Sequence, residues 1–415
     1  MTGIVGANAG RHDAKIISLV CFPHMMSHVY WLVIPPMFPA LMAAFDLTAL
    51  KAGVIVSVFA AATMIAQTPV GFLVDRVGAR WILIGGLAIE GAAIAAFGMA
   101  DAYWQLLVLA GIAGLGHTVF HPADYAILSA RVSERRMGRA FSIHSATGYV
   151  GFAIAPIYMT EVAARWNWQA AFLSIGVIGL FAALVLLLQS GSLRDEGEAA
   201  KARRKKEAKA SEPEPGRSGG TLAGDLRLLL SIPVMMCFLY FILHQLGGGG
   251  LRAFLVVALA DLYDTPVVDA ARALSAFTIG SVVGILTGGI VADRFGPRVM
   301  TGFATLVPAG LIVGLLGWVD IQGILLVALL AVSGYLIGVL IPSRDLLLRS
   351  VTPPGSMGKV MGFASTGTNL GGAIIPAVLG YVMDVAGGSW VFGISAIFIG
   401  AAFLTFVTAS RQSGR

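Results

Sequence analysis

Twelve long runs of apolar residues, separated by short polar segments, follow one another along the chain. Each run has about the 20 residues that an α-helix needs to cross a bilayer, where lipid-exposed backbone must be hydrogen-bonded within its own helix. The pattern therefore predicts an all-α membrane protein with twelve transmembrane helices. The expected helices are residues 16–44, 52–74, 80–100, 103–130, 137–162, 168–190, 226–258, 268–292, 298–319, 322–343, 356–384 and 388–409.

A polar segment between the sixth and seventh runs divides the chain in two. It contains KARRKKEAKASEPEPGRSGG, which is rich in charged residues, Pro, Ser and Gly and has no apolar periodicity. Such a composition is typical of a solvated linker. We therefore predict an N-terminal half of residues 1–190, a cytoplasmic linker of residues 191–225 and a C-terminal half of residues 226–415.

Composition agrees with a membrane protein, because 57% of the residues are apolar and 12% are charged, against about 25% charged residues in a soluble domain. The polar N-terminal segment does not resemble a cleavable signal peptide. Cys21 and Cys237 lie within apolar runs and lack metal-binding spacing, so no disulfide is expected. The chain has no Walker loop, nucleophile elbow or HExxH motif, so neither an enzyme nor a cofactor is expected.

The distribution of Lys and Arg predicts the orientation in the membrane. With the N-terminus in the cytoplasm, at most Lys51, Arg165, Arg272 and Arg252 lie on the opposite face, out of 28 Lys and Arg residues. This bias follows the positive-inside rule and predicts a multi-pass protein of the cytoplasmic membrane with both termini inside. Because topology and anionic lipid explain the basic linker, no nucleic-acid partner is expected.

The two halves repeat each other at offsets of 216 to 220 residues. Two six-helix halves of the same orientation are typical of transporters that bind their substrate between the halves, near the membrane midplane. The matching positions include His28 and His244, Asp75 and Asp293, Arg76 and Arg294, Gly114 and Gly334, and Pro122 and Pro342.

Two loops carry the same motif, Gly71-Phe-Leu-Val-Asp-Arg-Val-Gly-Ala-Arg80 and Gly289-Ile-Val-Ala-Asp-Arg-Phe-Gly-Pro-Arg298. It resembles the conserved loop motif of the major facilitator superfamily, in which small residues let helices approach and the Asp and Arg side chains can contact neighbouring helix ends. The resemblance implies conformational roles for Asp75, Arg76, Gly78, Arg80, Asp293, Arg294 and Arg298.

A narrower resemblance lies in the first and fourth helices, which contain Pro23-His-Met-Met-Ser-His28 and Gly114-Leu-Gly followed by Phe120-His-Pro122. These segments are similar to the fosmidomycin-resistance group of the superfamily, whose members are regarded as proton-coupled exporters. The resemblance implies a monomer with a central cavity lined by helices 1, 4, 7 and 10. His28 stands where the group commonly has Asp, His117 and His144 are additions, and Tyr149 replaces an Asn.

Histidines inside membrane helices are functional candidates, because burying ionisable groups in a bilayer is costly. His24 and His28 are four residues apart, as are His117 and His121, so each pair is expected to share a helical face. The histidines, with His144, could be packing residues, proton and anion sites, or transition-metal ligands. We favour proton and anion chemistry. For a metal, the ligands would be His24, His28, His117 and His121, with Asp124 the one carboxylate that could complete the set.

The seventh helix contains His244-Gln245-Leu followed by four consecutive glycines, Gly247 to Gly250. This run predicts a bend or an unwound turn, which is where transporters place binding sites. Arg252 lies just beyond it, either as an anion ligand or as a side chain that extends to the membrane interface.

Asp124 and Arg344 occupy equivalent repeat positions and carry opposite charges. We hypothesise that they pair as a cytoplasmic gate, closed when the cavity faces outward, with Asp345 and Arg349 as alternative local partners. Glu90 lies in the middle of an apolar run, where burying an unpaired carboxylate is costly, so we expect it to be protonated or paired. It could serve as a secondary proton site or form a structural hydrogen bond.

We therefore predict a secondary active transporter that moves a small anionic organic solute or drug by alternating access. Its expected partners are this substrate, protons and the lipid bilayer. Proton coupling and export follow from the resemblance. The alternatives are a transition-metal or metal-chelate transporter that uses the cavity histidines, and a non-transporting membrane receptor or scaffold.

Overall fold

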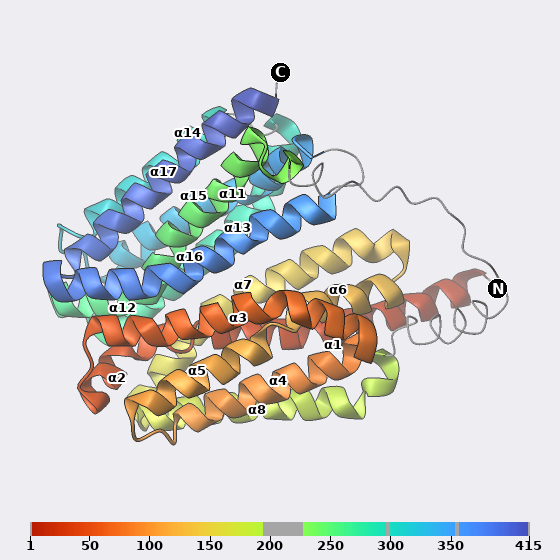
Figure 1. The fold of residues 1–415 in the computed structure, drawn as a ribbon, viewed down its shortest axis with the longest axis horizontal. Helices are drawn as coiled ribbons and strands as arrows, with labels where there is room; N and C mark the ends of the chain where they lie inside the picture. The colour runs from red at the N-terminus through yellow and green to blue at the C-terminus, as the bar shows by residue number, and fades with distance from the viewer. Residues whose placement is uncertain (1, 194–226, 296–298, 353–356, 414–415) are drawn as a thin grey trace.

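The computed structural model describes residues 2–193, 227–295, 299–352 and 357–413. Within these ranges the chain is helical and has no strand, which confirms the all-α prediction (Figure 1). Of the predicted linker, the part from residue 194 onward lies outside the described residues. Cys21 and Cys237 are buried and unpaired.

The N-terminal half crosses the membrane six times. Two crossings are interrupted. After α1 the chain turns where Pro35 and Pro36 cannot donate a backbone hydrogen bond. Two residues, Thr118 and Val119, separate α5 from α6. The elements are α1 (Thr2–Trp31), η1 (Pro35–Met37), α2 (Phe38–Phe45), α3 (Ala49–Val77), α4 (Ala79–Phe97), α5 (Tyr103–His117), α6 (Phe120–Arg131), α7 (Glu134–Arg165), α8 (Trp168–Leu188) and η2 (Ser190–Leu193).

The C-terminal half repeats this arrangement with six more crossings. Its first crossing contains the four glycines, where a bend or an unwound turn was predicted, and the backbone there is not unwound. It continues as a wide π-helical turn, η3 (Gln245–Gly249). The other elements are α11 (Ile232–His244), α12 (Gly250–Tyr263), α13 (Val267–Phe295), α14 (Val299–Leu315), α15 (Gly323–Ser350), α16 (Met357–Ala386) and α17 (Ser389–Ser413).

Ten helical segments in the described ranges are long and apolar enough to cross a membrane. The two remaining crossings are α7 and α14. α14 has 17 residues, and α7 carries Ser, His and Thr side chains that lower its hydropathy. The twelve crossings confirm the predicted fold of two pseudo-symmetric six-helix halves.

The two halves meet at one end of the molecule, which we call the closed end. There α3 packs against α16, and α7 against α13. The Asp384 carboxylate of α16 accepts hydrogen bonds from the backbone N–H groups of Ala49 and Leu50, each at 2.8 Å. Arg272 of α13 forms an ion pair with Glu161 of α7 at 2.8 Å.

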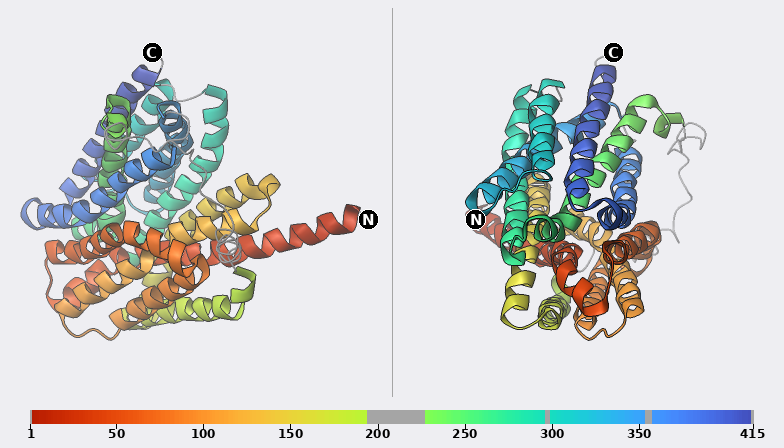
Figure 2. Two further views of the ribbon diagram at one scale, coloured as in Figure 1. Left: turned by 45° about the vertical axis from the view of Figure 1, so that its right-hand side comes forward. Right: turned by 90° about the vertical axis from the view of Figure 1, so that its left-hand side faces the viewer.

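Away from the closed end, the ribbons of the two halves diverge toward the opposite, open end (Figures 1 and 2). The α3–α4 and α6–α7 connections lie at the open end, beyond which the N-terminal part of α1 projects (Figure 2). The helices of the two halves therefore lie closer together at the closed end than at the open end (Figures 1 and 2).

Replacing Asp384 with alanine is expected to loosen the closed end. Its carboxylate satisfies two free N–H groups at the positive N-terminus of α3. The loss should cost the closed conformation about 1 kcal/mol, or roughly fivefold in population. Distances between spin labels placed on the two halves at the closed end would measure this. Asp101→Ala, an exposed carboxylate at the same end, is the control, and equal distances in both variants would contradict the prediction.

Candidate substrate-binding cavity

A cavity of about 210 Å³ lies between the two halves. Both halves line it, so its shape depends on how they pack. The N-terminal half contributes His28, Trp31, Thr63, Gln67, His117, His121, Tyr149 and Phe152. The C-terminal half contributes His244, Gln245, Arg252, Arg344, Thr368 and Asn369.

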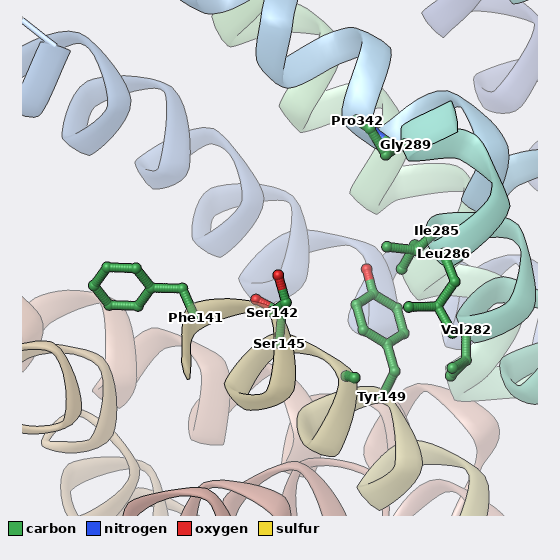
Figure 3. Close-up of a pocket in the computed structure, with 10 residues that line it drawn as sticks. Phe141, Ser142, Ser145, Tyr149, Val282, Ile285, Leu286, Gly289 and Pro342 are labelled. Atoms are coloured by element: carbon green, nitrogen blue, oxygen red, sulfur yellow. The ribbon is translucent and has the colours of Figure 1, made fainter. Parts of the chain in front are cut away.

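A second pocket, of about 400 Å³, adjoins this cavity. Figure 3 shows it between Ser142 and Ser145 of α7 and the apolar side chains of α13, among them Leu286. Tyr149 lines both spaces. Its side chain therefore stands between the central cavity and the second pocket.

Four histidines gather on the N-terminal side of the cavity, from α1, α6 and α7. The His24 ring stacks on His144 with centroids 3.6 Å apart, and it lies 4.6 Å from His28 and 5.3 Å from His121. Gly148 makes room for them, since a Cβ there would lie 2.9 Å from Nε2 of both His24 and His28. The structure thus brings together four of the predicted histidines.

Asp124 is the carboxylate of this cluster. Its Oδ2 lies 3.0 Å from Nε2 of His144 and 3.3 Å from Nδ1 of His24, and its side chain is fully buried. The predicted ion pair between Asp124 and Arg344 is therefore absent from this conformation. Arg344 instead pairs with its neighbour Asp345 at 2.8 Å, the local alternative considered above.

His117 does not join the other histidines. Its Nδ1 lies 2.9 Å from Oε1 of Glu90, which is fully buried. His117 and His121 both border the cavity, although α5 ends at His117 and α6 starts at Phe120. That they share one helical face stays a prediction. Glu90 is paired, as expected, and its partner borders the cavity.

Positive charge dominates the C-terminal wall. Arg252 donates to Oε1 of Gln245 at 3.2 Å and lies 5.7 Å from the centre of the Phe152 ring. No carboxylate in the described ranges forms an ion pair with Arg252. Its place in the cavity contradicts the alternative in which it extends to the membrane interface. Arg344 stacks on Phe241 at 4.3 Å, and His244 stacks on Tyr240 at 5.8 Å.

The motif residues lie at the open end, away from the cavity. Gly78 adopts a φ of 102° between α3 and α4, a left-handed conformation that favours glycine. Arg80 stacks on Trp81 and Arg294 on Phe295, whereas Arg76 and Asp293 are exposed. Arg298 and the side chain of Asp75 lie outside what the structure describes.

Sequence reasoning missed several cavity residues, above all Gln67 and Asn369. The Asn369 amide donates to the Gln67 carbonyl oxygen, which joins α16 to α3 across the cavity. Both stand in apolar runs, where an uncharged amide is costly to bury without a partner. An amide side chain within an apolar run is therefore the feature of the sequence that could have indicated these two residues. The aromatic residues Trp31 and Phe152 gave none, because aromatic residues are common in any membrane helix.

Comparisons with known proteins place the chain in a family. The model of the Major Facilitator Superfamily matches residues 20–271 and 237–414. The fosmidomycin resistance protein of Escherichia coli is 23% identical over 393 residues, which cover 92% of this chain and 90% of that protein. A multidrug resistance protein of Enterobacter lignolyticus is 30% identical over 148 residues, which cover 36% of this chain and 35% of that protein.

A solved structure agrees on the fold. It is the inward-facing, occupied form of a bacterial homologue of the human lysosomal transporter Spinster, with a TM-score of 0.76 and 15% identity. The alignment covers 96% of this chain and 97% of that one. The helical halves, the duplicated loop motif and the family match agree, and the chain belongs to the major facilitator superfamily.

Proposed function

We propose that this protein is a secondary active transporter that moves a small organic anion by alternating access. The observation that carries the proposal is the guanidinium of Arg252, which borders the cavity without a carboxylate partner in the described residues. A cation inside a membrane protein is costly unless it is compensated. A carboxylate or phosphonate bound between the halves would supply that compensation through charge-assisted hydrogen bonds.

The two relatives are named for resistance to drugs, which favours export of a drug or related organic anion from the cell. The cavity is small, at about 210 Å³, so the substrate should be a compact molecule. We infer that the protein acts as a monomer, because one chain supplies both of the halves that alternating access requires.

The positive-inside rule places the open end in the cytoplasm. Arg76, Arg80, Arg131, Arg136 and Arg139 lie at that end, whereas the closed end holds Lys51, Arg165 and Arg272. We infer a cytoplasmic membrane location with both termini inside. The two loop motifs stand where the halves would have to meet when the cavity opens outward, which supports their proposed conformational role.

Proton coupling is best assigned to the pair of Glu90 and His117. Glu90 is fully buried, its Oε2 has no hydrogen-bond partner in the described part of the chain, and its Oε1 lies 2.9 Å from Nδ1 of His117. His117 borders the cavity, so a proton can reach Glu90 from the substrate site through one imidazole. An imidazole has two ring nitrogens, one of which can accept a proton while the other donates one, which suits a relay.

Thermal melting tests the anion assignment. The purified protein would be melted with small carboxylates and phosphonates and with matched neutral and cationic analogues. An anion at about 100 times its Kd should stabilise the folded protein by roughly 2.7 kcal/mol. In Arg252→Gln, loss of a charge-assisted contact of about 1.5–3 kcal/mol should weaken binding roughly 10- to 150-fold.

The matched control is Arg165→Gln, because Arg165 is exposed at the closed end and lies outside the cavity. The anion should raise the melting temperature of this variant by as much as it raises that of the wild type. A shift caused equally by cationic analogues, or one that survives in Arg252→Gln, would rule out the anion assignment.

A further inference from the structure

Three donor atoms converge where α1, α6 and α7 meet. They are Nδ1 of His24, Oδ2 of Asp124 and Nε2 of His144, all within 4.8 Å of one another. Each side chain is buried, with at most 3% of its surface exposed. His24 and His144 are more than 100 residues apart in the sequence, so only the fold brings the three residues together.

The spacing of these atoms suits a metal ion. Metal bonds to imidazole nitrogen and carboxylate oxygen are about 2.0–2.2 Å long, which places adjacent donors of a tetrahedral site roughly 3.3 Å apart. The Asp124 oxygen lies 3.0 Å from the His144 nitrogen and 3.3 Å from the His24 nitrogen. The donors can bind one ion once the stacked rings of His24 and His144 tilt so that both nitrogens point toward it.

A hydrogen-bonded network alone leaves this cluster incomplete. Nδ1 of His24 and Oδ1 of Asp124 are buried and have no hydrogen-bond partner among the described residues. Buried polar atoms in proteins nearly always have one. A cation bound between the two imidazoles and the carboxylate would satisfy the His24 nitrogen and the charge of Asp124 together.

We propose that His24, Asp124 and His144 form a binding site for one first-row divalent metal ion. Two imidazoles and one carboxylate suit Zn²⁺, Co²⁺ or Ni²⁺, whereas Mg²⁺ and Ca²⁺ favour all-oxygen sites. Three protein ligands leave a fourth position open. His121 lies beside the site and also borders the cavity, so an ion can enter from there.

The ion is a resident of the protein and not its cargo. All three ligands belong to the N-terminal half, whereas alternating access works largely by moving one half against the other. The site therefore persists in both conformations and ties α1, α6 and α7 together. It also adds fixed positive charge behind the wall formed by His28 and His121. The site does not depend on the proposed anion substrate.

Cobalt binding tests the site directly. The full chain, without a polyhistidine tag, would be stripped with a chelator and dialysed against Co²⁺. We expect one tightly held Co²⁺ per chain, counted by elemental analysis, with visible absorption from a nitrogen-ligated ion. His24→Ala and His144→Ala should each weaken binding at least about 100-fold, the upper range for loss of a supporting contact.

Two further histidine variants are matched controls. His244→Ala changes a cavity histidine of the other half, and His117→Ala changes the partner of Glu90; both should hold Co²⁺ as the wild type does. Asp124→Asn, which keeps the side-chain shape, makes the same test if an alanine variant aggregates. Absence of bound Co²⁺ in the wild type, or equal binding in the ligand variants, would overturn the site. Accumulation of Co²⁺ inside proteoliposomes would overturn its resident role.

Discussion

Gly53→Val is expected to stop transport while each half stays folded. Gly53 of α3 faces α16 at the closed end, and a Cβ there would overlap the carbonyl oxygen of Pro376. Because that atom is backbone, it cannot move aside without separating the two helices. Overpacking costs about 1–3 kcal/mol or more, which shifts a two-state equilibrium by roughly 5- to 150-fold. The protein should then favour the conformation with this end open.

The measurements are substrate flux in proteoliposomes and the separation of spin labels across the closed end. Gly380→Val should behave alike, because a Cβ at Gly380 would overlap the backbone oxygen of Ala49. Gly400→Val is the control, since nothing lies within 4 Å of its Cβ position. Near-normal flux in Gly53→Val would show that the closed end tolerates a wider separation.

A glycine inside one half should respond differently. Gly280 of α13 packs against the Ala331 carbonyl of α15, and these two helices belong to the same half. Gly280→Val should therefore reduce the amount of folded protein, and not only its flux. The contrast separates contacts that break during transport from contacts that hold a half together.

The helices could be predicted from sequence because their main determinant is local. An apolar run of membrane length has to be helical in lipid, and the repeat follows from comparing the chain with itself. Interruptions within the helices were harder to predict from the sequence. Four glycines at Gly247 to Gly250 have low helix propensity, yet packing against α16 and α17 keeps them helical, as a π turn. Tertiary contacts outweighed propensity at that point.

The site was predicted in its residue types but not in its pairings. Helical spacing grouped His117 with His121, and both border the cavity, but the spacing did not indicate that Glu90 is the partner of His117. Nothing near His144 in the sequence indicates that it stacks on His24, because α1 and α7 meet only in the folded half. Contacts between distant segments are set by packing, which spacing does not encode.

The pairing of Asp124 with Arg344 was predicted for a cavity that faces outward, and it stays a prediction because it is not formed in this conformation. The two halves have diverged around these positions. At an offset of 216 residues, His24 corresponds to Tyr240, so the C-terminal half lacks the imidazoles that hold Asp124. Arg344 stacks on Phe241 instead. The same divergence gives the cavity a histidine wall on one side and two arginines on the other, which is the basis of the proposed anion preference.

Glu90→Gln is expected to uncouple transport from the proton gradient. A glutamine keeps the size of the side chain and can still hydrogen-bond to His117, but it cannot take up or release a proton. Tyr30 of α1, whose hydroxyl donates to the Ile175 carbonyl, also lies within electrostatic reach of Glu90, but phenols do not titrate near neutral pH. The pair of Glu90 and His117 should therefore lose its exchangeable proton in this variant.

Proteoliposomes distinguish coupling from binding. With the anion that raises the melting temperature, Glu90→Gln should show exchange of labelled for unlabelled anion near the wild-type rate. Accumulation driven by a pH gradient should fall to the level of protein-free vesicles. Asp46→Asn, at an exposed turn, should retain both activities. If Glu90→Gln still accumulates the anion, the coupling proton binds elsewhere, and Glu90 serves only to hold His117 in place at the cavity wall.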